Sequence, residues 1–406
     1  MGASIRTAIV MSRLPRLVPP DAPWLLGVRA GLRRVRDRGQ LLLIGTGTAG
    51  CEFVRRGAEL LDLNHERVSP SSGSTEPEQC SSLDPTIAIP ERDRTLAAAA
   101  DELLVLGLRS NGHWHRLLRD RLRTGAGGVT LVDLPNLEGA TVRDELASLG
   151  AAVWKPTSVE TGSLSSVPVR VATLSEDILE LVPFPAADGW VSLSHTTRGC
   201  PGPWPEQSPE DYLDSLLLSR SDADHSPVGT LERILQQQRL IASARTAREG
   251  VRVVSFTASP LSLLPELRRF RPHRSRWDFE PFGLCLRRSW LEERGARPVI
   301  YGDEVTWRDL NTNDRPFFQL AQSQPRVPAE AAADEQMPAH IDWTIEREWR
   351  HIGDLDLSQL PRECGLIFVP NYATARRIAT VSSWPITLWP DPAVEVGEES
   401  RVGSGQ

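Results

Sequence analysis

The chain has 406 residues, a formal net charge of −7 and 24% charged residues. At this length a single hydrophobic core is unusual, so we expect two domains. The hydrophobic fraction of 40% is that of an ordinary globular protein. The negative net charge gives no overall electrostatic drive for binding along a nucleic-acid backbone.

Five cysteines are widely spaced and include no Cys-x-x-Cys pair: Cys51, Cys80, Cys200, Cys285 and Cys364. This spacing argues against a disulfide framework and a zinc site, and it favours a reducing compartment. No apolar run approaches the roughly 20 residues that a spanning helix needs, and no signal peptide is recognisable. We therefore expect a cytoplasmic protein with no membrane attachment and no resident metal.

The first domain is expected over residues 22–155, after a leader of residues 1–21. Within it, an apolar run leads into three glycines in Gly-x-Gly-x-x-Gly spacing, Gly45, Gly47 and Gly50. Glycines allow a phosphate to approach the backbone closely, and the N-terminus of a following helix offers free N–H groups. The acidic residue that would hold a ribose about 20 positions further on is missing. A plain strand-to-helix turn is therefore the alternative to a nucleotide site.

Short apolar runs at 102–108 and 129–134 alternate with helical patterns such as 113–122. Strands that alternate with helices in this way predict a parallel sheet. We therefore expect an α/β, Rossmann-like first domain.

The segment from Arg92 to His113 resembles the nucleotide-binding Rossmann-type domains of the lysine-decarboxylase-like and DNA-processing-protein group. These domains place a helix opened by a glycine against a nucleotide phosphate. The resemblance implies a nucleotide ligand for this domain, with three residues at its ligand end: Arg109, Asn111 and Gly112.

We place a linker at residues 156–187, where the chain is rich in Ser and Thr and carries prolines. The second domain is expected over residues 188–392, followed by a disordered tail at 393–406. Many short strand patterns, with the helical patterns gathered early, predict a mixed α+β domain rather than a second parallel sheet.

Within the second domain, residues 342–356 alternate aromatic and charged side chains. As a strand, this stretch puts Glu346, Glu348 and Arg350 on one face and its two tryptophans on the other. The two carboxylates would then lie roughly 6.5 Å apart. The alternative is a helical turn with Glu346 and Arg350 as an i, i+4 ion pair.

Four segments of the second domain follow one order along the chain: Ser194-His195-Thr196, a helix within 231–243, a strand within 254–260, and Glu348-Trp349-Arg350. This order resembles the ADP-ribosyltransferase superfamily, most closely the DarT-type enzymes that modify DNA bases using NAD. The resemblance implies NAD as a substrate and a nucleic-acid or protein acceptor. It also implies that His195 holds the NAD ribose or amide and that Glu348 is the catalytic carboxylate.

Cleavage of the nicotinamide–ribose bond passes through an oxocarbenium-like state, as glycoside hydrolysis does. A carboxylate on the ribose face stabilises that cation, which suits Glu348, and Glu346 is a candidate for activating the acceptor. Arginine forks suit a pyrophosphate and aromatic faces suit nicotinamide. Arg350 or Arg276 is a candidate for the pyrophosphate, and Phe256 or Tyr301 for the nicotinamide. The further candidate NAD-binding residues are Thr196, Arg198 and Thr257.

We predict an NAD-consuming, ADP-ribosyltransferase-like enzyme with an N-terminal nucleotide-sensing domain. One alternative is a non-catalytic two-domain protein that binds a nucleotide or a partner. Another is a nuclease that uses Glu346, Glu348 and Asp354 with a divalent metal, because carboxylate oxygens are hard ligands. The oligomeric state is not indicated by the sequence.

Overall fold

The chain forms two compact units, seen in a computed structural model. The structure describes residues 4–12, 14–15, 17–69, 89–134, 140–165, 181–184, 190–244, 247–271, 276–321 and 343–390. The first unit comprises Met1–Val171 and Cys200–His225, and the second comprises Ala172–Gly199 and Ser226–Gln406. The tail predicted at 393–406 lies outside the described residues. None of the helices in the described ranges is long and apolar enough to cross a membrane.

Six parallel strands form the sheet of the first unit, in the order β3-β2-β1-β4-β5-β6. The strands are β1 Arg6–Met11, β2 Leu41–Ile44, β3 His65–Arg67, β4 Glu102–Leu106, β5 Gly128–Val132 and β6 Ala152–Trp154. The predicted parallel sheet is thus confirmed. The chain builds outward from β1 in one direction and then restarts at β4 in the other, so β1 and β4 flank the topological switch point of the sheet.

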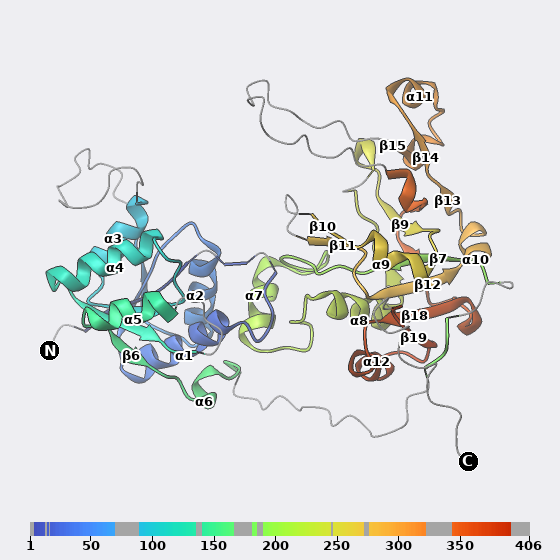
Figure 1. Ribbon diagram of the computed structural model, residues 1–406. Coiled ribbons are helices and arrows are strands. Elements are labelled where there is room, and N and C mark those ends of the chain that lie inside the picture. The colour runs from blue at the N-terminus through green and yellow to red at the C-terminus, as the bar shows by residue number, and fades with distance from the viewer. Residues whose placement is uncertain are drawn as a thin grey trace, which may run out of the picture. The chain divides into compact units, whose positions relative to one another are not determined.

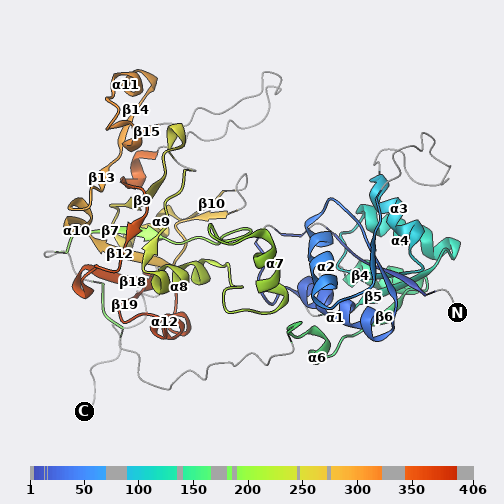
Figure 2. The ribbon, with the colours of Figure 1, turned by 180° about the vertical axis from the view of Figure 1, so that it is seen from behind.

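Helices cover both faces of this sheet (Figures 1 and 2). One face packs against α1 Pro23–Asp37 and α2 Ala49–Leu60, and the other against α3 Glu91–Ala99, α4 His113–Thr124 and α5 Ala140–Ser148. A short helix, α6 Ser158–Thr161, follows β6. Because side chains alternate along a strand, Ile9 of β1 joins one core and Ala8 and Val10 the other.

The first strand overturns the prediction that residues 1–21 are a leader. Strand β1 lies between β2 and β4, and its Thr7 and Ala8 are fully buried. A strand buried on both faces has a short, continuous apolar run without alternation. In this chain that run is only Ala8 to Met11, preceded and followed by arginines, and composition alone did not distinguish it from a basic leader.

Residues Cys200–His225, expected in the second domain, belong to the first unit. Their helix α7, Pro209–Leu217, packs against α1 and α2 through Leu213, Leu216 and Leu217. Asp214 accepts hydrogen bonds from Arg56 at 2.6 and 2.8 Å, and the buried Arg29 donates to the Leu216 carbonyl. The chain therefore leaves the second unit after β7 and returns before α8.

A seven-stranded sheet forms the centre of the second unit, in the order β13-β16-β9-β7-β12-β18-β19. Neighbouring strands are antiparallel except for β18 and β19, which are parallel, so this is a mixed sheet and, as predicted, not another parallel one. The strands are β7 Ser192–Thr196, β9 Val253–Thr257, β12 Gly283–Arg287, β13 Arg297–Pro298, β16 Glu348–Ile352, β18 Gly365–Val369 and β19 Ile386–Leu388.

One face of this sheet packs against α8 Pro227–Gln237, α10 Arg288–Glu292 and α12 Tyr372–Ala379. The opposite face carries a smaller core with the 3-10 helix Leu261–Leu263 and α9 Leu264–Leu267. The remaining elements are short: α11 Glu304–Asp309 and the strand pairs β8 Arg239–Leu240 with β17 Leu355–Asp356, β10 Arg269–Arg271 with β11 Arg276–Asp278, and β14 Ile300–Gly302 with β15 Phe318–Leu320.

The stretch predicted as a strand over 342–356 divides into two elements. Residues Trp343–Glu346 form a 3-10 turn, and β16 begins only at Glu348. Between them Arg347 has a φ of 45°, in the left-handed region, which interrupts the alternation of side chains. Glu346 and Glu348 therefore do not lie on one strand, and the spacing expected from a regular strand does not apply to them.

Candidate functional site

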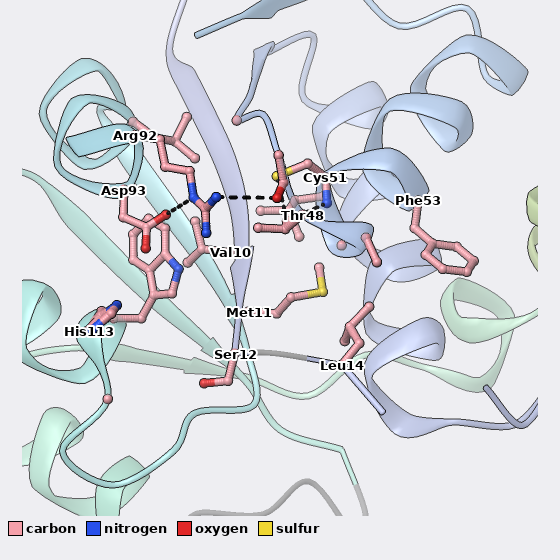
Figure 3. Close-up of a pocket in the computed structure, with 18 of the residues that line it drawn as sticks. Val10, Met11, Ser12, Leu14, Thr48, Cys51, Phe53, Arg92, Asp93 and His113 are labelled. Carbon is pink, nitrogen blue, oxygen red and sulfur yellow. Dashed lines mark hydrogen bonds and ion pairs between the residues drawn. The ribbon is translucent and has the colours of Figure 1, made fainter. Parts of the chain in front are cut away.

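A cavity of about 870 Å³ lies in the first unit at the carboxyl ends of β1, β2 and β4 (Figure 3). Met11 and Ser12 enter it from the end of β1, the turn Gly45–Cys51 from the end of β2, and Arg109 and Asn111 from the loop after β4. Ligands of open α/β sheets bind beyond the carboxyl ends of the strands, at the switch point. The cavity occupies this position, and its volume suits a small-molecule site.

The three glycines predicted to form a phosphate turn, Gly45, Gly47 and Gly50, all line the cavity. Gly47 has a φ of 78°, and a Cβ on Gly50 would lie 2.9 Å from the Met11 sulfur. The backbone of Gly47 therefore favours glycine, whereas a Cβ on Gly50 would require a shift of the flexible Met11 side chain. In the Gly-x-Gly-x-x-Gly fingerprint of dinucleotide-binding domains the turn follows the first strand; here it follows β2 and lies beside β1.

The turn opens directly into α2. Thr48 caps this helix, because its hydroxyl accepts a hydrogen bond from the Cys51 amide at 3.2 Å. The Thr48 hydroxyl is also 3.0 Å from the Cys51 sulfur, and burial raises the pKa of the Cys51 thiol. Cys51 is therefore a neutral thiol near pH 7 and is not an activated nucleophile.

Cationic and polar groups gather at one side of the cavity, where Figure 3 shows Arg92, Asp93 and His113 together. Arg92 donates to the Gly47 carbonyl at 3.3 Å and lies 3.5 Å from the Asp93 carboxylate. The Arg109 amide donates to the Ser12 hydroxyl at 3.0 Å, which ties the loop after β4 to the end of β1. An arginine beside a glycine turn is an arrangement that suits a phosphate group.

Apolar side chains line the other side, where Leu14 and Phe53 lie in Figure 3. Tyr212 of α7 also lines the cavity, and its ring meets Phe53 edge to face at 6.3 Å between centroids. The cavity thus has a polar side formed by the glycine turn and arginines and an apolar side closed by aromatic rings.

Sequence reasoning located part of this cavity. Arg109, Asn111 and Gly112, expected at the ligand end of the domain, do line it. The prediction does not include Ser12, because it assigns residues 1–21 to a leader, and it does not include Tyr212, which comes from a distant part of the chain. The available signal for Ser12 was a polar residue directly after a short apolar run, the usual pattern at the carboxyl end of a parallel strand.

In the second unit, the structure does not bring His195 and Glu348 to one face of the sheet. His195 lies near Phe256, at 5.7 Å between ring centroids, on the face that carries Leu193. Glu348 is opposite Thr257 across β16 and β9, and Thr257 is opposite Ser194, so these three side chains share the other face. Burial lowers the pKa of His195 to about 4, and its ring is therefore neutral near pH 7.

The Glu348 carboxylate is held by a buried arginine. Arg350 donates to both of its oxygens, at 2.9 and 3.1 Å, and Ser255 donates at 2.7 Å. The Arg350 side chain is fully buried and also donates to the Phe318 carbonyl at 2.8 Å. Arg350, a predicted candidate for binding a pyrophosphate, is therefore a structural residue that positions Glu348.

Other predicted NAD-binding residues also have structural roles in the sheet. Phe256 is buried in the core and cannot stack on a ligand, and the buried Thr257 donates its hydroxyl to the Glu346 carbonyl at 2.6 Å. Thr196 pairs with Gly283 in the sheet. Arg276 lies in β11, and its side chain is outside the described part of the chain.

Glu346 stands in a cluster of charged groups. The pKa of Glu346 is raised to about 7, mainly by burial and also by the carboxylates of Asp278 and Glu348, while Arg198 and Arg271 oppose the rise. Asp278 lies 3.7 Å from Arg198 and 2.6 Å from Arg271. A carboxyl group with a pKa near 7 can exchange a proton at neutral pH, which is the property of a general acid or base.

The metal site proposed for a nuclease is not formed. Asp354 lies beyond the other end of β16 from Glu348, where its carboxylate accepts from the Ala242 amide at 2.7 Å and from Arg252 at 3.3 Å. In the described ranges, no three His, Cys, Asp or Glu side chains gather closely enough to hold a metal ion.

The raised pKa of Glu346 predicts a pH-dependent effect on stability. Between pH 4.5 and about 7, Glu346 is protonated in the folded protein and ionised in the unfolded chain. The stability that Glu346 contributes is therefore present at low pH and is lost as pH rises through this window. Glu346→Gln cannot titrate, so its stability relative to wild type should increase across the window by on the order of 2 kcal/mol. Urea unfolding at pH 4.5 and pH 8 measures the difference.

The lowered pKa of His195 makes stability rise with pH instead, but it acts in both proteins and cancels in the comparison. Glu293→Gln changes an exposed carboxylate and is the matched control, expected to follow wild type. A constant difference between Glu346→Gln and wild type at the two pH values would contradict the assigned environment of Glu346.

Comparison with known proteins gives no assignment of function, so the proposals below rest on the geometry of the two sites. No protein-family model, no curated protein and no solved structure matches this chain.

Proposed function

We propose that the first unit binds a nucleotide in the cavity at the switch point of its parallel sheet. The proposal rests on three features that line the same cavity. These are the glycine turn into α2, the arginines Arg92 and Arg109, and an apolar side formed by Phe53 and Tyr212. A phosphate group requires close backbone approach and positive charge, and a base requires an apolar, aromatic surface.

The same features give the ligand an orientation. The phosphates lie at the glycine turn, where the N-terminus of α2 and Arg92 supply positive charge. The base lies toward Phe53 and Tyr212. The turn follows β2, and the acidic residue of the dinucleotide fingerprint is missing, so we favour a mononucleotide over a dinucleotide.

Replacing Arg92 tests the phosphate end. Arg92→Ala removes a cation beside the turn and should weaken ADP binding about tenfold or more, the usual effect of losing a charged hydrogen bond. Isothermal titration of the full chain with ADP measures this. The matched control is Arg94→Ala, an exposed arginine of the same helix outside the cavity lining, which should bind as wild type does. Absence of ADP, ATP and AMP binding to wild type would overturn the proposal.

NAD-consuming ADP-ribosyl transfer by the second unit is a second candidate function. The observation that favours it is the pair of carboxyl groups at the start of β16: Glu348, held in place by Ser255 and Arg350, and Glu346, with a pKa of about 7. A fixed carboxylate suits stabilisation of an oxocarbenium ion, and a titrating one suits activation of the acceptor. The roles of His195, Phe256, Thr257 and Arg350 implied by the resemblance are not part of this proposal.

Nicotinamide release from NAD tests this second function. Glu348→Gln and Glu346→Gln should each lower the rate by about 100-fold or more, the usual contribution of a charge-stabilising or proton-transferring group. Glu304→Gln, which alters an exposed carboxylate paired with Arg248, is the control and should keep the wild-type rate. Wild-type protein that releases no nicotinamide with any acceptor offered, or variants as fast as wild type, would exclude the function.

A further inference from the structure

The nucleotide cavity is closed by a segment of chain that begins and ends in the second unit. Gly202 and Tyr212, which line the cavity, both belong to Cys200–His225. The residues on either side, up to Gly199 and from Ser226, belong to the second unit. A ligand in the cavity therefore touches a segment whose two ends are covalently continuous with the other half of the protein.

This segment is fastened to the helix that forms the glycine turn. Asp214 of α7 takes two hydrogen bonds from Arg56 of α2, and its side chain is only 9% exposed. At the cavity, Tyr212 packs against Phe53, which is also on α2. Because a packed, ion-paired contact does not deform gradually, α7 and α2 move together or separate as a whole.

The two ends of the segment are tied to each other. In the first unit, the Cys200 amide donates to the His225 carbonyl at 2.9 Å, and the His225 ring lies 3.3 Å from the Cys200 carbonyl. The same ring stacks on Trp204 at 4.0 Å and meets Tyr212 at 4.9 Å. The wall of the cavity is therefore in contact with the point at which the chain leaves the unit.

The chain on either side of this segment, in the second unit, is also joined by hydrogen bonds. Thr197 donates its hydroxyl to the Pro227 carbonyl at 2.9 Å, and Thr230 donates to the Arg198 carbonyl at 2.7 Å. These bonds join the end of β7 to the start of α8. Arg198 also lies 3.7 Å from Asp278, in the charged cluster around Glu346.

We propose that Cys200–His225 couples the nucleotide cavity to the second unit: a nucleotide stabilises the arrangement in which Tyr212 closes the cavity, and the paired chain ends pass this stabilisation to β7 and α8. The inference rests on the proposed nucleotide function. A ligand shifts an equilibrium only by its differential affinity for the two states, and Tyr212 supplies that difference because it contacts the ligand only when α7 is seated on α2.

Hydrogen exchange of the full chain with and without ADP tests the coupling. At about 100 times the dissociation constant, opening motions that break the site should slow by about 100-fold. We expect slower exchange at residues 45–53, at 202–217, and also at 192–199 and 227–237 in the second unit. The last two regions contain no cavity residue, so protection there reports coupling.

Asp214→Asn supplies the decisive comparison, because it weakens the attachment of α7 while leaving every cavity side chain in place. ADP should still protect 45–53 in this variant and should lose its effect on 192–199 and 227–237. Arg55→Gln is the matched control: Arg55 lies on α2 next to Arg56 but pairs with Glu52 and Glu59 within that helix, and this variant should behave as wild type.

The outcomes separate this inference from the proposed function. Protection of wild type confined to 45–53 and 202–217 would overturn the coupling while leaving the nucleotide site standing. Absence of protection at 45–53 would overturn the nucleotide site itself and the coupling with it. If Asp214→Asn does not fold, exchange of the wild-type protein with and without ADP still decides whether the two units are coupled. Tyr212→Ala then replaces Asp214→Asn as the variant. It removes one ring from the cavity and should weaken ADP binding about tenfold.

Discussion

The position of β1 between β2 and β4 determines what the first unit can bind. Parallel strands carry their loops away from the same edge, and where the order of the sheet reverses, neighbouring loops diverge and leave a crevice. The loop after β1 and the loop after β4 separate in this way, with Ser12 and Arg109 joined by one hydrogen bond at the base. The glycine turn, the arginines and the apolar wall matter for binding because they surround this crevice.

A different constraint organises the second unit. Arg350 is completely buried, and such a charge is tolerated only when it is paired and hydrogen-bonded. Glu348, Gln319 and the carbonyls of Pro316 and Phe318 satisfy it. Glu348 is thus committed to a buried ion pair, whereas the pKa of the neighbouring Glu346 is raised to about 7, mainly by burial.

The sequence allowed prediction of features that depend on local pattern. Alternating strands and helices predicted the parallel sheet, and the glycine spacing and the loop at Arg109 to Gly112 fell at the cavity. Features that depend on long-range packing were not predictable. The assignment of Cys200–His225 to the first unit rests on the contact of α7 with α2, and no periodicity in either segment indicates its partner.

Two failures have specific physical causes. Alternation of Trp and Glu residues predicted one continuous strand, but the left-handed backbone at Arg347 turns Glu346 out of register. The family resemblance matched His195 and Glu348 by their order in the chain, and order does not determine which face of a sheet a side chain occupies. The register of β7, β9 and β16 determines that, and it places these two residues on opposite faces.

The central claim is that the cavity at the carboxyl ends of β1, β2 and β4 is a nucleotide site. Its most direct test is a crystal structure of the protein grown with ADP. The account predicts density in this cavity, with the diphosphate against Gly45 to Gly50 and the base against Phe53 and Tyr212. An empty cavity at saturating ADP, or ADP bound elsewhere on the protein, would contradict it.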